Sequence, residues 1–445
     1  MKLLNTSITA LLVALSFSAS VAQENATMSL REAQDYAVKN AFSVKSALSD
    51  QLNAGLSVDE LIGIGLPQVN ASLQYQNYID LPTSLVPAEF FGGEPGSFAK
   101  LQFGTPHNMT VGLSASQLLF DGSWLVGLQA SRAYADLQKK QVLKSEIQVR
   151  NDVASAYYLA LISQRNLELL QESRKVIASL LDDTKAMYEN GFVEEQDVQQ
   201  LQLSLNDFDN RLAYADEQVK LTYDMLKFNM GMPLSTSLGL TESADELIGQ
   251  SSSDALASSM VVDTYIDVQL VQGGLEMQKL SLKNQRAKLL PQAGAFYNLQ
   301  SQAQRNAFNF FDTSQPWFPV QLWGVQLNVP IFSGMSKSKS VQKGKVEVQR
   351  MTDMLAMTRE ATQLEFNAAR SELEYAQKNH TASKNNLELA TDILRKTNIR
   401  FKEGLASSFE VSQGTNQVLV AQSTYIQAML QLLNADARMN KLLGR

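Results

Sequence analysis

The chain has 445 residues, a hydrophobic fraction of 44% and a formal net charge of −7, with no cysteine and only two histidines. The negative charge argues against a nucleic-acid partner, because phosphates demand a basic surface. The lack of cysteine excludes disulfides and thiolate metal sites, and His107 and His380 are far apart in the sequence. We therefore expect no metal, no cofactor and no nucleic-acid binding.

The N-terminus has the pattern of a secretory signal peptide. Lys2 is its charged start, Ile8–Phe17 its apolar core, and Ser-Val-Ala at residues 20–22 its small-residue cleavage site. An ordinary first helix is the alternative, but the apolar run is short and polar residues follow at once. We expect the signal peptide to span residues 1–22, so that an exported mature chain begins at Gln23. After residue 22, no apolar run reaches the roughly 18 residues that a membrane-spanning helix needs.

The first half of the mature chain opens with a helical pattern from Ser29 to about Gly65. Ser29 and Glu32 have capping-box spacing, in which each side chain accepts a hydrogen bond from the other residue's backbone. Leu-Pro-Gln at residues 66–68 ends the pattern, since proline cannot continue a helix. The same tripeptide returns at residues 290–292 after a second helical stretch, about residues 262–289. The repetition indicates a duplicated chain.

After each Leu-Pro-Gln the hydrophobic period changes from 3.6 to 2, which predicts two strands within residues 68–120 and two within residues 293–332. One face of these strands is apolar and the other carries Asn, Gln and Ser. Outer-membrane barrel strands show this alternation, although an ordinary half-buried sheet shows it too. The polar face lacks Lys and Glu, which favours the barrel. Aromatic residues near the predicted strand ends resemble interfacial girdles: Tyr78, Phe120, Trp317, Trp323 and Phe332.

The loops inside each strand pair, residues 81–107 and 305–319, are expected to face the outside. The helices are then expected in the periplasm, and the strands in contact with outer-membrane lipid. Because barrels need about eight strands or more, four strands per chain cannot close, and unpaired edges are costly in lipid. We therefore expect the chain to oligomerise.

Each half continues into a long helix, a glycine at a helical tip, and a return helix of about half the length. The tip glycines are Gly191 and Gly404, and the stretch 191–231 recurs at 404–444 without a gap, an offset of 404 − 191 = 213 positions. Apolar residues in the return helices are seven apart, which is typical of a left-handed coiled coil. They are Val198, Leu205, Leu212, Val219 and Leu226, and then Val411, Val418, Tyr425, Leu432 and Met439.

The predicted organisation is therefore a signal peptide at 1–22, a first repeat at 23–231, a linker at 232–262 and a second repeat at 263–445. The linker has no clean period and is expected to form small elements packed outside the helical rod. The fold class is mainly α with a membrane β-barrel, built from duplicated strand–strand–long-helix units. Met351, Met354 and Met357 step by three along a helix, and we interpret them as core rather than a metal path.

The order of these features resembles the TolC family of outer-membrane efflux proteins over about residues 24–445. That resemblance implies a homotrimer whose 12-stranded barrel, three copies of four strands, continues into a periplasmic α-helical coiled-coil tunnel. It also implies docking to a periplasmic adaptor protein and an inner-membrane pump, in efflux or type I secretion. We find no residues for enzymatic chemistry, and neither the cargo nor the pump class has a motif in the sequence.

In that family the tunnel narrows at its periplasmic entrance, where carboxylates follow the tip glycines. The matching positions are Asp197 and Glu410, with Gln200 and Gln413 three residues further on. A carboxylate ring would attract cations. Helix capping is the alternative role for both carboxylates. Gln413 stands where a second carboxylate can occur, and Ala406 where a basic latch residue can occur, so we expect a simple constriction without a salt-bridged latch.

Two other classes of function remain open at this point. A structural or adhesive coiled-coil protein could use the barrel only as an anchor, without transport. A soluble, adaptor-like periplasmic coiled coil is a further alternative, against which the strand alternation argues.

Overall fold

The computed structural model describes residues 26–250, 256 and 258–444. The predicted signal peptide and the mature start at Gln23 lie outside the described residues. The chain divides into two compact units. The tip unit contains the described residues up to Ser49 together with residues 140–269 and 356–444, and the sheet unit contains residues 50–139 and 270–355.

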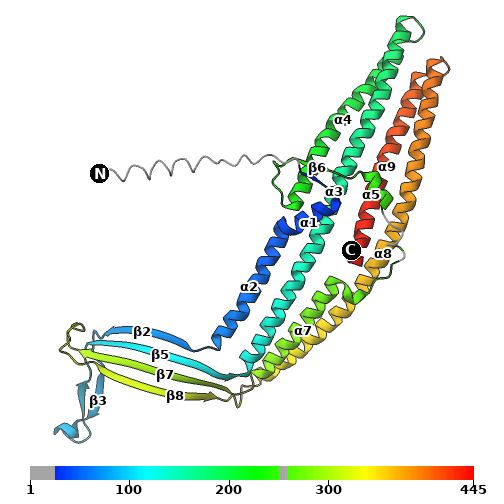
Figure 1. The fold of residues 1–445 in the computed structure, drawn as a ribbon. Coiled ribbons are helices and arrows are strands. Elements are labelled where there is room, and N and C mark those ends of the chain that lie inside the picture. Colours follow the sequence, from blue (N-terminus) through cyan, green and yellow to red (C-terminus); the bar gives the residue numbers. More distant parts are fainter. Residues whose placement is uncertain (1–25, 251–255, 257, 445) are drawn as a thin grey trace, which may run out of the picture. The chain divides into compact units, whose positions relative to one another are not determined.

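Most of the helices are long (Figure 1). The α-helices are α1 (Leu30–Asn40), α2 (Phe42–Ile64), α3 (Gly122–Glu189), α4 (Glu195–Met230), α5 (Ala244–Gln250), α7 (Ile266–Ala287), α8 (Ser336–Lys402) and α9 (Ser408–Leu443). Four of them, namely α2, α3, α7 and α8, contain residues of both units. Two short 3₁₀ helices are η1 (Ala88–Phe91) and η2 (Val262–Thr264). In the part of the chain that the structure describes, no helix combines the length and the hydrophobicity needed to cross a bilayer.

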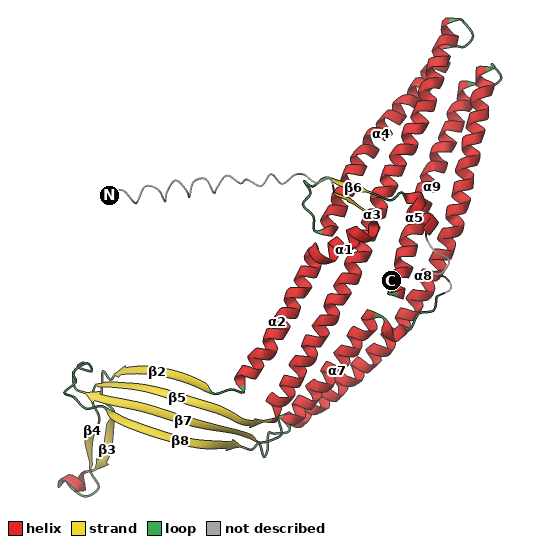
Figure 2. Cartoon of the chain, viewed as in Figure 1, coloured by secondary structure: helices red, strands yellow, loops and turns green. Residues whose placement is uncertain are grey.

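The main sheet has four antiparallel strands in the order β2-β5-β7-β8 (Figure 2). They are β2 (Gln68–Asn77), β5 (His107–Asp121), β7 (Gln292–Arg305) and β8 (Phe318–Asn328). The edge strands β2 and β8 each pair on one side only within this sheet. Two smaller pairs are β1 (Ala26–Met28) with β6 (Leu238–Leu240), and β3 (Thr83–Pro87) with β4 (Phe98–Gln102).

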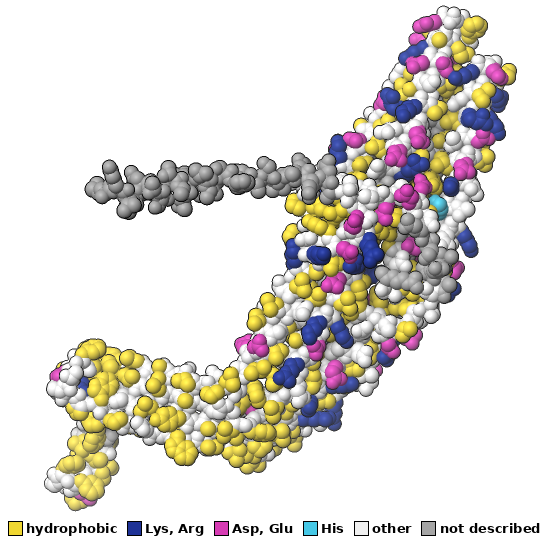
Figure 3. All heavy atoms as spheres, in the orientation of Figure 1, with side chains coloured by type: hydrophobic (Ala, Val, Ile, Leu, Met, Phe, Trp, Pro, Cys, Tyr) yellow, Lys and Arg dark blue, Asp and Glu magenta, His cyan; other side chains and the backbone are white. Residues whose placement is uncertain are grey.

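The strand register confirms the predicted two-faced pattern. Leu113 of β5 lies opposite Ala71 of β2 and Leu299 of β7, whereas its neighbour Ser114 lies opposite Asn70 and Asn298. Within these four strands, Asp, Glu, Lys, Arg and His residues stand only at strand ends, namely His107, Asp121 and Arg305. In Figure 3 the visible face of the sheet is accordingly dominated by hydrophobic side chains, while charges cover the helices.

Three details of the strand region differ from the sequence predictions. Trp323 lies in the middle of β8, opposite Tyr297, rather than near a strand end. The second strand pair lies closer to its connecting loop than predicted, because β7 continues to Arg305 and β8 already ends at Asn328. Phe332 therefore lies beyond the end of the strand. The loop at residues 81–107 contains the β3–β4 hairpin and η1, whose short strands were too brief to show a period.

The first helical stretch is broken into α1 and α2 at Ala41, whose ψ of 137° is extended. The predicted capping box is confirmed: the Ser29 N–H donates to the Glu32 carboxylate at 2.8 Å, and Glu32 N–H donates to Ser29 Oγ. Gly231, which ends α4, lies so close that a Cβ there would meet the Asn40 carbonyl oxygen at 2.5 Å. The break therefore accommodates the end of α4 against the α1–α2 junction.

The linker joins elements that are distant in sequence. Tyr157 of α3 is fully buried, and its hydroxyl donates to the Met28 carbonyl and to Glu242, each at 3.1 Å. Glu242 also accepts from the Leu30 N–H at 2.7 Å, at the start of α1. Burial raises the pKa of Tyr157 above its ordinary value, so the hydroxyl stays protonated and donates. These contacts fix the linker against α1 and α3 in the tip unit.

Candidate periplasmic entrance

The two helical tips have the same backbone design. Gly191 and Gly404 adopt left-handed φ angles of 76° and 73°. At each tip the glycine N–H and the next N–H return to the last turn of the long helix: Phe192 N–H donates to Met187 O at 2.9 Å, and Leu405 N–H to Arg400 O at 2.8 Å. This Schellman arrangement satisfies carbonyls that a helix end leaves open, and it requires a left-handed residue that glycine supplies without strain.

Asp197 and Glu410 both accept hydrogen bonds from the first turn of their own helices. The Asp197 carboxylate accepts from the Glu194 N–H at 3.1 Å, and Glu410 accepts from the Ser407 N–H at 2.9 Å. Ser407 Oγ in turn accepts from the Glu410 N–H at 3.3 Å, which completes a capping box. Asp197 is half-buried and Glu410 is exposed, so each carboxylate can cap its helix and still face solvent.

The structure brings the two return helices together at Gln200. Its Nε2 donates to the hydroxyl of Ser412 on α9 at 3.3 Å. Gln413, the next residue, is exposed and lines a groove of about 680 Å³ along α8 and α9 with Asn386 and Asn416. Asp197 and Gln200 stand three apart on α4, and Glu410 and Gln413 three apart on α9, so each pair shares one helical face.

A small apolar cluster holds both tips in place. Leu180 and Leu181 of α3, Leu201 of α4, and Phe401 and Val411 from the second hairpin are all buried in it. Ala406, where the resemblance allows a basic latch residue, packs partly buried against this cluster instead. A charged side chain there would face an apolar surface.

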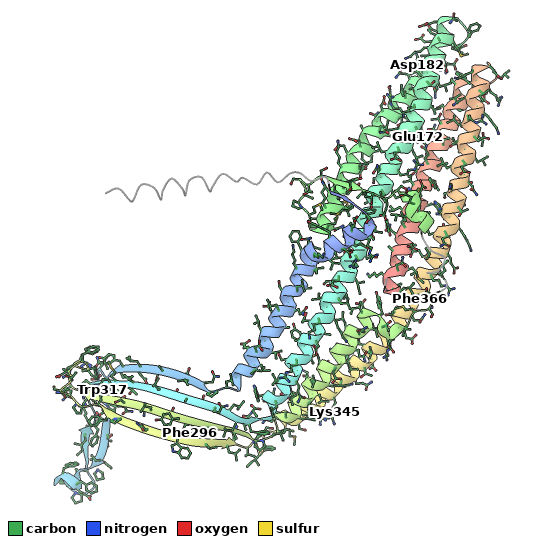
Figure 4. All side chains as sticks on the ribbon, viewed as in Figure 1. Glu172, Asp182, Phe296, Trp317, Lys345 and Phe366 are labelled. Carbon is green, nitrogen blue, oxygen red and sulfur yellow. The ribbon has the colours of Figure 1, made fainter. Side chains whose placement is uncertain are left out.

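An ion pair behind the tips could not be predicted from the sequence. Lys402 Nζ of α8 lies 2.5 Å from the Asp183 carboxylate of α3, with both side chains about half exposed. Such exposed pairs contribute only about 0–1 kcal/mol, but this one joins the two hairpins of a single chain. Neighbouring Asp182 and, further along α3, Glu172 are exposed carboxylates, labelled in Figure 4. No periodic pattern marks such a pair, because Asp183 and Lys402 are distant in sequence.

A second missed residue is Gln422 of α9, which is buried between the hairpins. Its Nε2 donates to the Ser173 hydroxyl of α3 at 2.7 Å, while its Oε1 has no hydrogen-bond partner among the described residues. Gln422 lines a cavity of about 500 Å³ together with other residues of α3, α4, α8 and α9, and most of the lining surface is apolar. Among the described residues, no three His, Asp or Glu side chains gather as a metal site.

Two-faced strands without internal charges, long paired helices and capped tips together define an outer-membrane channel fold with periplasmic helices. A family model for outer membrane efflux proteins matches residues 65–231 and 267–445. The chain belongs to this family of outer membrane efflux proteins.

Individual relatives are distant in sequence but similar in fold. Nodulation protein T of Rhizobium leguminosarum bv. trifolii is 21% identical over 370 residues, which cover 79% of this chain and 74% of that protein. Three solved structures each cover 93% of this chain. CusC matches with a TM-score of 0.71, 13% identity and 91% of its own chain covered. The Campylobacter jejuni CmeC outer membrane channel matches with a TM-score of 0.70, 14% identity and 85% of its own chain covered. VceC of Vibrio cholerae matches with a TM-score of 0.68, 15% identity and 96% of its own chain covered.

The chain is therefore an outer-membrane efflux channel with its helices in the periplasm, as the sequence predicted, and a transport conduit rather than an enzyme. The family match favours transport over a barrel-anchored adhesive protein. It also excludes the soluble adaptor-like alternative.

Proposed function

We propose that three copies of this chain form one export channel, each contributing four strands to a 12-stranded barrel and its helices to a periplasmic tunnel. The observation that supports this best is the open sheet, because β2 and β8 leave one edge each unpaired. β2 runs toward the loop end of the sheet and β8 runs away from it, so β8 of the next copy would pair with β2 antiparallel, as every other pair in this sheet does. Pairing satisfies backbone groups that lipid cannot.

An exposed apolar stripe on α4 supports the same assembly. Five large side chains of α4 are each 45% or more exposed although they fall on one helical face at spacings of 11, 7, 4 and 3 residues: Leu203, Tyr214, Leu221, Met225 and Phe228. Stripes of this kind on a long helix are normally covered by another helix. Helices of a neighbouring copy would cover it in a closed ring.

The assembled tunnel is proposed to receive substrate from a periplasmic adaptor protein and an inner-membrane pump. This cavity suits an adaptor helix, because apolar Val176, Leu387 and Leu394 line it. The charged Glu172 and Arg395 line it too and are exposed. An amphipathic helix can lay its apolar face into such a groove and pair its flanking charges with the border. We expect Val176→Arg to abolish adaptor cross-linking in cells, while Val420→Arg, at a more exposed position on α9 outside this groove, leaves it intact.

Asp197 and Glu410 are proposed to line the periplasmic entrance and to favour cations there. In a trimer they would place two carboxylates from each chain, six in all, around one opening. Replacing them together by Asn and Gln removes these charges, while the Gln at 410 can still accept the Ser407 N–H bond. Under a salt gradient across a planar bilayer, the reversal potential of the double mutant should shift toward zero. An unchanged potential would leave helix capping as the role of both residues.

Conduction itself separates export from anchoring. Purified protein should form trimers in detergent and conduct ions in planar bilayers, whereas an anchor with a filled barrel should not conduct. Failure to conduct at any applied voltage would contradict the proposed channel.

A further inference from the structure

The β3–β4 hairpin, residues 83–102, is unusually apolar for a loop at the outer end of a membrane protein. Leu85, Phe90, Phe91 and Phe98 are all at least 60% exposed, and Phe90 reaches 81%. Tyr78 N–H donates to the Pro106 carbonyl at 2.8 Å, which ties the base of the hairpin to the ends of β2 and β5. An exposed apolar group of this size marks an interaction surface.

A second unpartnered apolar surface lies at the other edge of the sheet. Phe318, Val320 and Leu322 of β8, which we call the β8 stripe, are each 40% or more exposed. They lie opposite Gln302, Gln300 and Asn298 of β7. The β8 stripe therefore stands on the face that is otherwise polar, opposite to the face of Leu113 that lipid contacts.

The hairpin and the β8 stripe belong to opposite edges but to the same end of the sheet. The hairpin follows the last residue of β2 closely, since β2 ends at Asn77 and β3 begins at Thr83. Phe318 is the first residue of β8, next to the loop end of β7. Within one protomer β5 and β7 lie between the edge strands β2 and β8. When β2 of one copy pairs with β8 of the next, the two apolar surfaces meet at the seam.

We propose that the β3–β4 hairpin of each protomer folds over the β8 stripe of a second copy of this chain, and so narrows the outer mouth with a ring of apolar side chains. This inference rests on the proposed trimer. Removing aromatic surface from water favours the contact. Lipid would account for the hairpin alone, because the β8 stripe faces away from the lipid-facing side.

Cysteine cross-linking tests the contact, since the natural chain contains no cysteine. The variant with Phe98→Cys and Val320→Cys should form a disulfide-linked trimer on a non-reducing gel after mild oxidation. The matched control carries Phe98→Cys and Gln321→Cys, which moves one thiol by one residue to the lipid-facing side, and it should stay uncross-linked. All variants are first sized in detergent. A chain that never forms trimers contradicts the proposed function, whereas trimers in which Val320→Cys gives no link, or links no better than Gln321→Cys, overturn only the hairpin contact.

A second measurement tests the narrowing. The Phe90→Ser, Phe91→Ser double variant should show a higher single-channel conductance than the unmodified protein, and an unchanged conductance would overturn the narrowing. A fluorophore on Phe91→Cys should keep its emission in vesicles of brominated phospholipid. Strong quenching there would mean that lipid covers the hairpin, and would overturn the proposal.

Discussion

The two return helices α4 and α9 have the same length of 36 residues and the same heptad spacing, yet they are buried differently. Fourteen residues of α9 are buried, against six of α4. α9 contacts α5 as well as α4, and Tyr425 donates to Asp245 of α5 at 3.3 Å. α4 contacts α1 as well as α9, but its apolar stripe stays exposed. Two copies of one local pattern are therefore used differently: α9 is largely buried in the protomer, and the exposed stripe of α4 is the surface that we propose the next protomer covers.

The largest expected difference between the two helices is the loss of stability when a leucine is replaced by alanine. Leu433 of α9 is 2% exposed in the main core, whereas Leu221 of α4 is 52% exposed. Leu433→Ala should lower the free energy of unfolding by about 2–5 kcal/mol because it leaves a cavity. Leu221→Ala should change protomer unfolding by only about 0.5 kcal/mol but should lower the temperature at which trimers dissociate in detergent. Circular dichroism and gel mobility on heating measure the two effects, and similar unfolding losses in both variants would contradict the assigned roles.

Arg substitutions in the strands, unlike substitutions in the return helices, should cause equal losses of stability in both halves of the chain. Leu113→Arg in the first half and Val325→Arg in the second each place a charge on the lipid face, at an expected cost of about 2–4 kcal/mol near the bilayer midplane. Ser114→Arg and Gln326→Arg, one position along, face the polar side and should cost much less. Urea titration of protein refolded into bilayers gives these values. If the two faces were equally sensitive, the sheet would not face lipid.

At the two junctions from strand to helix, substitution by glycine should change the stability in opposite directions. In the first half, Ser123 N–H and Oγ both donate to the Asp121 carboxylate, so Ser123→Gly should destabilise by about 1 kcal/mol. Its counterpart Met335 has a left-handed φ of 66°, so Met335→Gly should stabilise by about 0.5–1 kcal/mol. Chemical denaturation in detergent measures both. A loss of stability at both positions would mean that the Met335 backbone is not strained.

The smallest expected effect is the pH dependence of stability that His380 of the second hairpin contributes. Burial lowers the pKa of His380, with a contribution from Lys384, while Asp245 opposes it. Because the unfolded chain binds the proton more readily, this stability is present above the unfolded pKa and is lost as pH falls toward the folded pKa. His380→Gln should therefore flatten the decrease in stability from about pH 7 downward. The position 213 residues earlier is Leu167, so Leu167→Gln serves as the control that should leave the slope unchanged.

Much of the local structure could be predicted from the sequence, because its causes are local. The capping box of Ser29, the glycines at both tips and the two-faced strands each depend on neighbouring residues, and each appears as predicted. The roles of Asp197, Glu410, Gln200 and Gln413 at an entrance stay predictions. The capping bonds of Asp197 and Glu410 form within one chain, whereas a pore would need three chains.

The sequence by itself determined the duplication, the period of every long element and the faces of the strands, because periodicity follows from backbone geometry. Only the tertiary structure decided which copy is more deeply buried, since the matching heptads acquire different neighbours when α5 of the linker packs against α9. It likewise decided the pairing of β1 with β6, the Asp183–Lys402 ion pair and the position of Gln422. Each of these joins residues distant in the chain, and such contacts have no spacing that a single sequence can show.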